Sequence, residues 1–312
     1  MAQSEPLSDR RGRMLAFANR NVRRLNQPGV RSRLFVIVGV VFLTALVVAL
    51  REHGHLLLGV KPLPLLLLAG LVGPVAVLLN ALEFKWMAAV TDLDVSWRRA
   101  VSVTVLSSAA NLLPLPGGVA VRVAELKAAG AGYRVGVSLN MCGGLMWLGM
   151  ALLIGGIAGS WFGQKPWFLS FVAVGAGVVM TTCVLLWRTT GRPSAAIALA
   201  LIKTVMVMVG AGRLYLCFTA LTLPVRAWQM LVLAVSGALG AAVSIVPSGL
   251  GVRESVVVGL SPAVGIAPGA GLLAAAVNRI LEMLVLVTWS VIIGRTEWRL
   301  AARKDVTDGG RG

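Results

Sequence analysis

The stretch Ser107–Tyr133, SSAANLLPLPGGVAVRVAELKAAGAGY, decides how the rest of this chain is interpreted. It begins as apolar, membrane-type sequence, is interrupted by prolines and paired glycines, and continues with charged residues. Proline removes a backbone donor and clashes with the preceding helical turn, whereas glycine permits the backbone angles of a tight reversal. We therefore expect a broken, re-entrant helical element here and not one continuous spanning helix.

The composition places the whole chain in the class of membrane proteins. Of its 312 residues, 57% are hydrophobic and 13% are charged, and several apolar runs reach the length of about 20 residues that a spanning helix needs. These runs lack the alternating pattern of barrel strands, and a bilayer requires every backbone group to be satisfied internally. The sequence predicts an all-α, polytopic membrane helical bundle.

The net charge of +17 does not indicate a nucleic-acid partner. Most basic residues flank apolar runs, where the excess of positive charge in cytoplasmic segments accounts for them. The three cysteines, Cys142, Cys183 and Cys217, are far apart and lie inside apolar runs. They are interpreted as small core residues, not as a disulfide or a metal site.

The predicted organisation is a basic cytoplasmic tail over 1–33, a membrane domain over 34–294 and a basic cytoplasmic tail over 295–312. The expected apolar runs are 34–50, 63–82, 100–121, 135–161, 167–187, 195–223, 228–246, and 256–294 with an interruption near 262–269. If 100–121 and 228–265 both dip into the membrane and return, only Arg51, Lys61, Lys165 and Arg226 lie outside. That distribution is the one the positive-inside rule favours. Full crossings in either region remain the alternative.

With this topology the two halves of the membrane domain would be inverted copies. Each copy has a span, a hairpin with a Pro-Gly turn, and another span, as in many secondary transporters. The expected turn residues are Pro116, Gly117 and Gly118 in the first hairpin and Pro247, Gly249 and Gly251 in the second.

The chemistry expected of the two hairpins is anion recognition. A half-helix that starts after a glycine turn presents unpaired backbone donors, and arginine adds bidentate charge-assisted bonds. Arg122 and Glu125 are three residues apart, as are Arg279 and Glu282, so each pair is expected to share a helix face. The candidate substrate-binding residues are Arg122, Glu125, Arg253, Glu254, Arg279, Glu282 and Arg213. The alternative is that they form structural ion pairs that hold the hairpins in place.

Four other polar residues have simpler interpretations. Lys203 is expected to extend towards the inner surface along its aliphatic stem. Glu83 and Lys85 are expected to pair at the membrane interface, and Asn111 is interpreted as a turn or packing residue.

The sequence resembles a known family at these same residues. Asn111–Arg122, NLLPLPGGVAVR, together with Gly130 and Val246–Glu254, VPSGLGVRE, is similar to the lysylphosphatidylglycerol synthase transmembrane region, a flippase-like family. The resemblance covers roughly residues 34–294 and implies movement of a lipid across the bacterial inner, cytoplasmic membrane. The chain resembles a stand-alone member, because only 18 residues, most of them polar, follow Gly294 and no aminoacyl-transferase domain is expected.

The resulting hypothesis is a lipid translocator that holds an anionic headgroup between the two hairpins. Aminoacyl lipids, polyprenyl phosphates, glycolipids and hopanoid-related lipids all remain open as substrates. No nucleotide-binding loop, catalytic motif, metal site or cofactor site is found. A membrane-embedded lipid-phosphate transferase, or a non-transporting scaffold for a lipid-synthesising enzyme, is the alternative.

Overall fold

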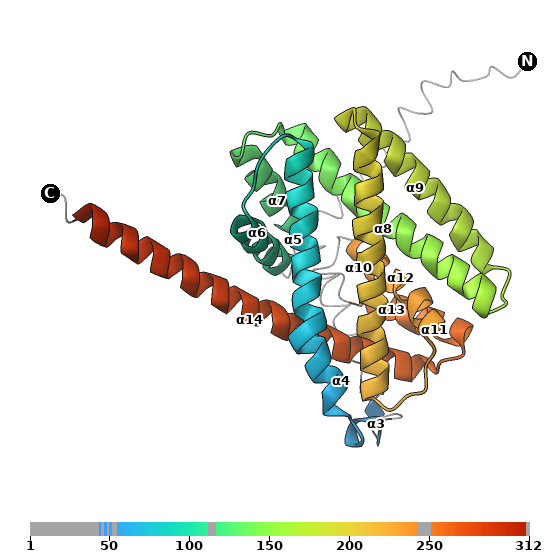
Figure 1. Ribbon diagram of the computed structural model, residues 1–312. Helices are drawn as coiled ribbons and strands as arrows, with labels where there is room; N and C mark the ends of the chain where they lie inside the picture. The colour runs from blue at the N-terminus through green and yellow to red at the C-terminus, as the bar shows by residue number, and fades with distance from the viewer. Residues whose placement is uncertain are drawn as a thin grey trace, which may run out of the picture.

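The computed structural model describes residues 55–111, 117–242 and 251–309, with a few positions between 44 and 51, and side chains as far as Ile293. Over these residues the protein contains helices and turns without any strand (Figure 1). The helices are α3 (His55–Leu58), α4 (Pro62–Leu67), the π-helical turn η1 (Leu68–Val72), α5 (Gly73–Val90), α6 (Trp97–Ala110), α7 (Gly117–Ala128), α8 (Tyr133–Phe162), α9 (Phe168–Thr190), α10 (Pro193–Ala220), α11 (Ala227–Leu233), α12 (Val235–Ala242), α13 (Val252–Leu260), the 3-10 turn η3 (Pro262–Val264) and α14 (Pro268–Gly309). The all-helical class expected from the sequence is confirmed.

The helix boundaries follow from local sequence signals. Pro62 and Pro193 occupy the first positions of α4 and α10, where the missing N–H is not needed. Ser96 caps α6, because its hydroxyl accepts a hydrogen bond from the Arg99 N–H. Gly191 ends α9 with a left-handed φ of 66°, the conformation that glycine adopts most readily at a helix end.

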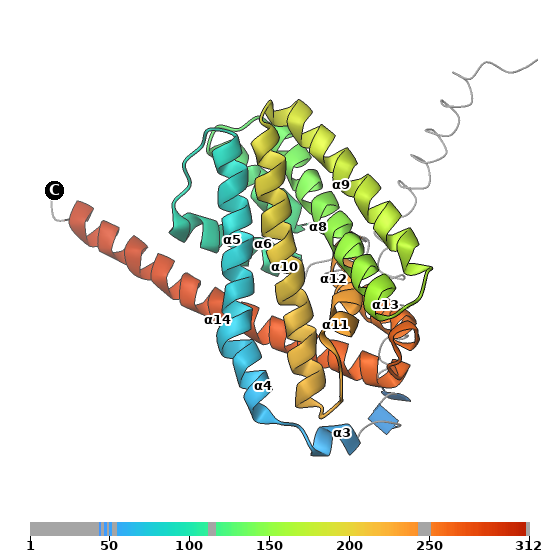
Figure 2. The ribbon, with the colours of Figure 1, turned by 45° about the vertical axis from the view of Figure 1, so that its right-hand side comes forward.

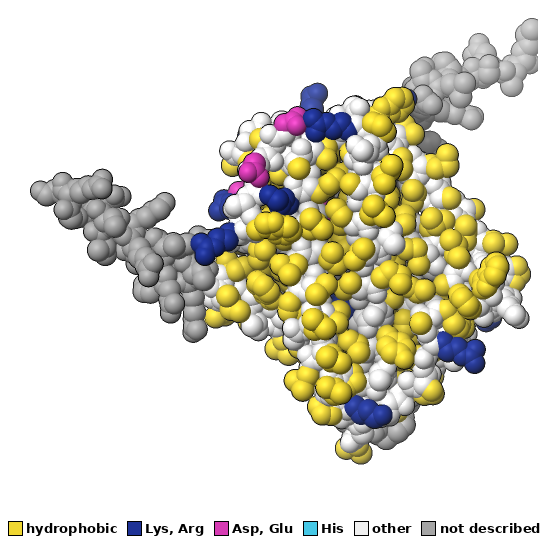
Figure 3. Space-filling model, viewed as in Figure 1, with side chains coloured by type: hydrophobic (Ala, Val, Ile, Leu, Met, Phe, Trp, Pro, Cys, Tyr) yellow, Lys and Arg dark blue, Asp and Glu magenta, His cyan; other side chains and the backbone are white. Residues whose placement is uncertain are grey.

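Within the described residues, five helical segments are long and apolar enough to cross a membrane. They are 62–90, 133–162, 168–190, 193–220 and 268–293. Hydrophobic side chains cover most of the visible face. Basic side chains lie towards both of its ends, whereas the acidic side chains in view lie only towards the upper end (Figure 3). This distribution matches an apolar belt facing lipid between two polar surfaces.

The loops fall into two groups that define the ends of the molecule. At one end, called the Asp92 end, Arg192 in the α9–α10 loop pairs with Asp92 in the α5–α6 loop at 2.9 Å. At the other, called the Lys61 end, the Lys61 N–H donates to the Ala220 carbonyl at 2.9 Å. The Asp92 end carries Lys85, Arg98, Arg99, Lys127, Arg134, Arg188 and Arg192, whereas Lys61, Lys165 and Arg226 lie at the Lys61 end.

The first broken region is an antiparallel pair of short helices. Arg99 at the start of α6 bonds Glu125 near the end of α7, and Gly118 at the start of α7 donates to Asn111 just after α6. Both arms therefore begin and end at the Asp92 end. At 1.5 Å per residue they extend about 21 and 18 Å, which is shorter than a hydrocarbon core of about 30 Å.

The second broken region has the same form at the Lys61 end. Gln229 at the start of α11 donates to the Val264 carbonyl in η3 at 2.8 Å. At the other extremity of this hairpin, Gly240 in α12 packs against Arg253 in α13, where an added Cβ would lie 3.0 Å from the Arg253 Cβ. The two hairpins thus start from opposite ends of the molecule (Figures 1 and 2).

The turns that precede the two hairpins share an unusual backbone geometry. Asp92 and Thr222, which lie 130 residues apart, have positive φ values of 57° and 59°. Each is followed by a leucine whose N–H bonds back over the end of the preceding helix, Leu93 to Ala88 and Leu223 to Phe218. The same local structure therefore terminates α5 and α10.

Helices α8 and α9 pack closely through small residues (Figure 2). A Cβ on Gly175 would lie 2.6 Å from the Leu153 backbone nitrogen, and one on Gly156 would lie 2.8 Å from that of Val172. Glycine permits this backbone approach, which is typical of helix pairs in membranes.

Two boundaries differ from the expectation or lie outside the described part of the chain. The last span was expected to end at Gly294, and the apolar part of α14 does end at Ile293. The helix itself continues to Gly309, because residues 295–308 contain many good helix formers and the next glycine pair is at 309–310. The expected run 34–50, apart from isolated positions, and the turn residues Pro116, Pro247 and Gly249 lie outside the described residues.

Candidate functional site

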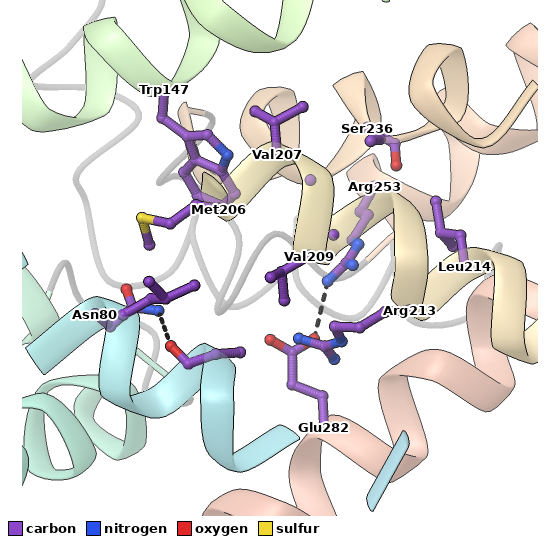
Figure 4. Close-up of a pocket in the computed structure, with 15 residues that line it drawn as sticks. Asn80, Trp147, Met206, Val207, Val209, Arg213, Leu214, Ser236, Arg253 and Glu282 are labelled. Atoms are coloured by element: carbon purple, nitrogen blue, oxygen red, sulfur yellow. Dashed lines mark hydrogen bonds and ion pairs between the residues drawn. The ribbon is translucent and has the colours of Figure 1, made fainter. Parts of the chain in front are cut away.

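A carboxylate shared by two arginines lies between the hairpins at the centre of the bundle. Glu282 of α14 accepts from Arg253 of α13 at 2.9 Å and pairs with Arg213 of α10 at 3.2 Å. Arg213 also donates through Nε to the Asn278 side-chain oxygen at 3.1 Å. Figure 4 shows both guanidinium groups approaching the carboxylate from different helices. The three charged groups together carry one excess positive charge.

This cluster borders a cavity of about 660 Å³, including its open mouth. The cavity, called cavity 1, lies between α5, α8, α10, α12, α13 and α14 and is lined by Asn80, Trp147, Arg213, Ser236, Arg253 and Glu282, among others. Ser236 is completely buried, and its hydroxyl has no hydrogen-bond partner within the described structure. Buried hydroxyls are normally satisfied, so this group is available to a ligand or to water.

A second cavity of about 670 Å³, called cavity 2, adjoins the first. Ala76, Asn80, Arg213 and Glu282 line both cavities. Cavity 2 extends to the first hairpin, where Thr104, Ser108 and Asn111 contribute to its wall. The Thr104 hydroxyl is buried and has no partner within the described residues.

A second charged cluster lies deeper in the protein. Glu83 of α5 pairs with Lys203 of α10 at 2.5 Å and with Arg122 of α7 at 3.6 Å. The Lys203 ammonium also lies 5.7 Å from the centre of the Trp147 ring, within the range of a cation–π contact. Trp147 thus separates this cluster from cavity 1.

This deep cluster corrects two expectations. Lys203 does not extend to the inner surface, and Glu83 does not pair with Lys85 at the interface. Glu83 and Lys203 are both 3% exposed and bind each other, because a buried charge is stabilised only by a partner. Lys85 instead donates to the Val95 carbonyl and pairs with Asp94.

Residues that share a helix face do not pair with each other in the first hairpin. Arg122 pairs with Glu83, while Glu125 forms two bonds with Arg99 at 2.5 and 2.8 Å near the Asp92 end. The reason is that the antiparallel hairpin brings the start of α6 against the end of α7. Glu125 therefore lies in the surface ion pair of the first hairpin and not in the central cluster.

In the second hairpin, too, the charged residues pair with residues on other helices. Arg279 lies 4.0 Å from Glu254, not beside Glu282. Glu254 caps its own helix, since its carboxylate accepts from the Gly251 N–H at 2.8 Å. Gly251 has a φ of 81°, which favours glycine at this turn. The Arg279 Nη2 is buried without a partner in the described part of the protein.

The expected site residues therefore separate into three groups. Arg213, Arg253 and Glu282 meet at the cavities, Arg122 belongs to the deep cluster, and Glu254, Arg279 and Glu125 stabilise the hairpins. Gly117 and Gly118 begin α7, and Asn111 accepts from Gly118 as a turn residue would.

Sequence reasoning did not single out several residues that belong to the site. Glu83 and Lys203 were recognised as charged but were placed at interfaces. Asn80, Thr104, Trp147 and Ser236 were not considered, and Asn278 was noted only as a polar residue of the last span. One available signal was that Glu83 and Lys203 both lie inside helices with few other charges. An ionisable residue within a span usually marks a functional or paired position.

In the part of the chain that the structure describes, the fold is all-helical, five of its helices are suited to crossing a membrane, and charged groups gather between two broken segments. No family model matches the chain, and no curated protein matches it.

Proposed function

We propose that this protein is a membrane translocator for lipids that carry an anionic headgroup. The observation that carries the proposal is the pair Arg213 and Arg253, which share the single carboxylate of Glu282 beside a cavity within the bundle. Two guanidinium groups on one carboxylate leave a positive charge unbalanced. A phosphate would neutralise that charge with bidentate hydrogen bonds.

The surroundings of the cavities suit a molecule with an apolar tail. Val205 and Met208 on α10 are 46% and 51% exposed, and Leu284 and Val287 on α14 are 56% and 58% exposed. These side chains lie beside or between the cavity-lining residues along the same helices. A headgroup can therefore enter the cavity while its acyl chains remain against apolar helix faces.

The arrangement of the hairpins supports an alternating mechanism. The two hairpins start from opposite ends, and the turns before them repeat after 130 residues. We propose that both hairpins are re-entrant in the membrane and that 62–162 and 193–293 are inverted repeats. In such folds a substrate is held at mid-membrane while one repeat moves against the other. The resemblance to the flippase-like family agrees with this proposal.

Glu282 would act as the resident counter-ion of the site. When no headgroup is bound, it neutralises one of the two arginines, so the cost of the buried charge is reduced. An incoming phosphate would replace Glu282 as the partner of one of the two guanidinium groups. When the phosphate leaves, that guanidinium would pair with Glu282 again. The protein's energy source would be a gradient or the supply of lipid itself.

Translocation in reconstituted vesicles tests the proposal. The protein is inserted into phosphatidylcholine vesicles that contain a trace of fluorescent phosphatidylglycerol, and dithionite reports how fast inner-leaflet probe becomes accessible. We expect the Arg213→Gln and Arg253→Gln variants to lose most of the activity. Arg192→Gln is the matched control, because Arg192 forms an exposed ion pair with Asp92.

Two outcomes overturn the proposal. If the unsubstituted protein does not move phosphatidylglycerol or any other anionic lipid, a scaffold role is favoured. If both arginine variants move lipid at the control rate, the site lies elsewhere.

A further inference from the structure

We infer that the preferred substrate carries a neutral polyhydroxyl group on its phosphate, such as glycerol, inositol or a sugar, and not an amine. This inference rests on the proposed function and identifies the headgroup class of the same site. It follows from the different chemistry of the two adjoining cavities.

Cavity 1 carries the positive charge that would bind a phosphate. Arg213 and Arg253 both line it, and their single shared counter-ion is Glu282. The buried Ser236 hydroxyl, which has no partner in the described structure, lies in the same wall and can donate to a phosphate oxygen. Figure 4 shows Arg213, Arg253 and Ser236 on the same side of this cavity.

Cavity 2 offers mainly hydrogen bonds. Its charged lining groups are Arg213 and Glu282, which neutralise each other and are shared with cavity 1. The remaining polar lining consists of Asn80, Thr104, Ser108 and Asn111. Hydroxyl and amide groups both donate and accept, so they match the hydroxyls of a polyol.

The Thr104 hydroxyl is an independent indication that a ligand binds at this polar wall of cavity 2. Its side chain is 1% exposed, and its hydroxyl has no partner among the described residues although it lines the cavity. A buried hydroxyl without a partner is costly. The unpartnered hydroxyls Thr104 and Ser236 come from α6 and α12, one from each hairpin.

An amine is a poor fit to the same wall. A carboxylate is the strongest protein partner for an ammonium group, and among the described residues Glu282 is the only carboxylate that lines either cavity. The Glu282 carboxylate already contacts Arg213 and Arg253. An amine would have to compete with both arginines for this carboxylate, and its positive charge would lie close to that of Arg213. The region 112–116 contains no ionisable residue that could change this balance, and neither does 243–250.

The two cavities meet at Asn80, Arg213 and Glu282. A phosphate at Arg213 can therefore direct its substituent into cavity 2.

The test compares four fluorescent lipids in reconstituted vesicles. Phosphatidylglycerol and phosphatidylinositol carry hydroxyls, phosphatidylmethanol has the same charge without them, and phosphatidylethanolamine carries an amine. We expect the two polyol lipids to move roughly twofold to tenfold faster than phosphatidylmethanol, the ratio that one neutral hydrogen bond provides. Phosphatidylethanolamine should be the slowest.

Substitutions in cavity 2 should remove this preference. Thr104→Val and Ser108→Ala are expected to lower the ratio between the polyol-lipid rate and the phosphatidylmethanol rate, both measured in the same variant, towards one. Thr181→Val is the matched control, since Thr181 is exposed on α9 and bonds only the Gly177 carbonyl of its own helix. Ser108 is half-buried, so Ser108→Ala tests the same wall if Thr104→Val does not fold.

The outcomes separate this inference from the function on which it rests. Equal rates for phosphatidylglycerol, phosphatidylinositol and phosphatidylmethanol overturn the inference and leave the translocator intact. Faster movement of phosphatidylethanolamine overturns it as well. Failure to move any of the four lipids overturns the proposed function itself.

Discussion

Glu83 on α5 and Lys203 on α10 are 120 residues apart in the sequence, and their side chains bind each other at 2.5 Å. Each is 3% exposed, and Arg122 from the first hairpin joins them. This contact connects the two proposed repeats deep in the bundle. Its removal would leave charges buried without a partner.

Substitution of Glu83 should therefore be costly. Loss of one partner from a buried ion pair destabilises proteins by about 3–5 kcal/mol, so Glu83→Gln should markedly lower the midpoint of thermal unfolding in detergent. The double variant Glu83→Gln, Lys203→Gln should lose less than the sum of the two single variants, because the unpaired ammonium is then absent.

The exposed pair Arg192–Asp92 provides the comparison for this measurement. Its side chains are 50% and 77% exposed, and Asp92→Asn should change stability by less than about 1 kcal/mol. If Glu83→Gln is as stable as Asp92→Asn, the deep cluster does not stabilise the bundle.

Two adjacent glycines on α8 should respond in opposite ways to alanine. A Cβ on Gly143 would lie 2.6 Å from the Glu83 Oε1 and 3.0 Å from the Met87 Cε, whereas one on Gly144 would meet nothing within 4 Å. Gly143→Ala must displace a carboxylate held by Lys203, so it should lower the unfolding temperature. Gly144→Ala should be neutral or stabilise by up to about 1 kcal/mol. Equal behaviour of the two variants in the same unfolding assay would contradict the packing around Glu83.

A similar pair on α9 tests its contact with α8. Gly175 lies against the backbone of Leu153, whereas Gly177 has open space around its Cβ direction. Gly175→Ala should separate the helices and lower stability by about 1–3 kcal/mol, while Gly177→Ala should have little effect. Thermal unfolding monitored by tryptophan fluorescence measures both. A Gly175→Ala protein as stable as the unsubstituted one would show that α8 and α9 are not in close backbone contact.

The two ends should be labelled from opposite sides of the membrane. In a cysteine-free background, Lys165→Cys should react with an impermeant maleimide in intact cells, and Asp94→Cys only after lysis. The reason is that the Asp92 end carries more basic residues and is expected to be cytoplasmic. Asp94 suits the test because its side chain is 97% exposed. Labelling of Asp94→Cys in intact cells would reverse the proposed orientation.

Much of the fold could be predicted from the sequence. The apolar runs at 63–82, 135–161, 167–187, 195–223 and 256–294 each fall within or overlap a helix long enough to span a membrane. The predicted break near Pro116 and Gly117 is observed as the end of α6 and the start of α7. These features are local: hydrophobicity, proline and glycine act within a few residues.

The partners of the charged residues were decided only by the tertiary structure. Spacing along a helix correctly puts Arg122 near Glu125 and Arg279 near Glu282, but in the fold each binds a group on another element. The sequence by itself predicted an all-helical protein with apolar segments long enough to cross a membrane and with interruptions near Pro116 and Pro247. Which charges meet, and which face the cavities, depended on how the hairpins pack, because a buried charge is stabilised by the nearest opposite charge in space and not in sequence.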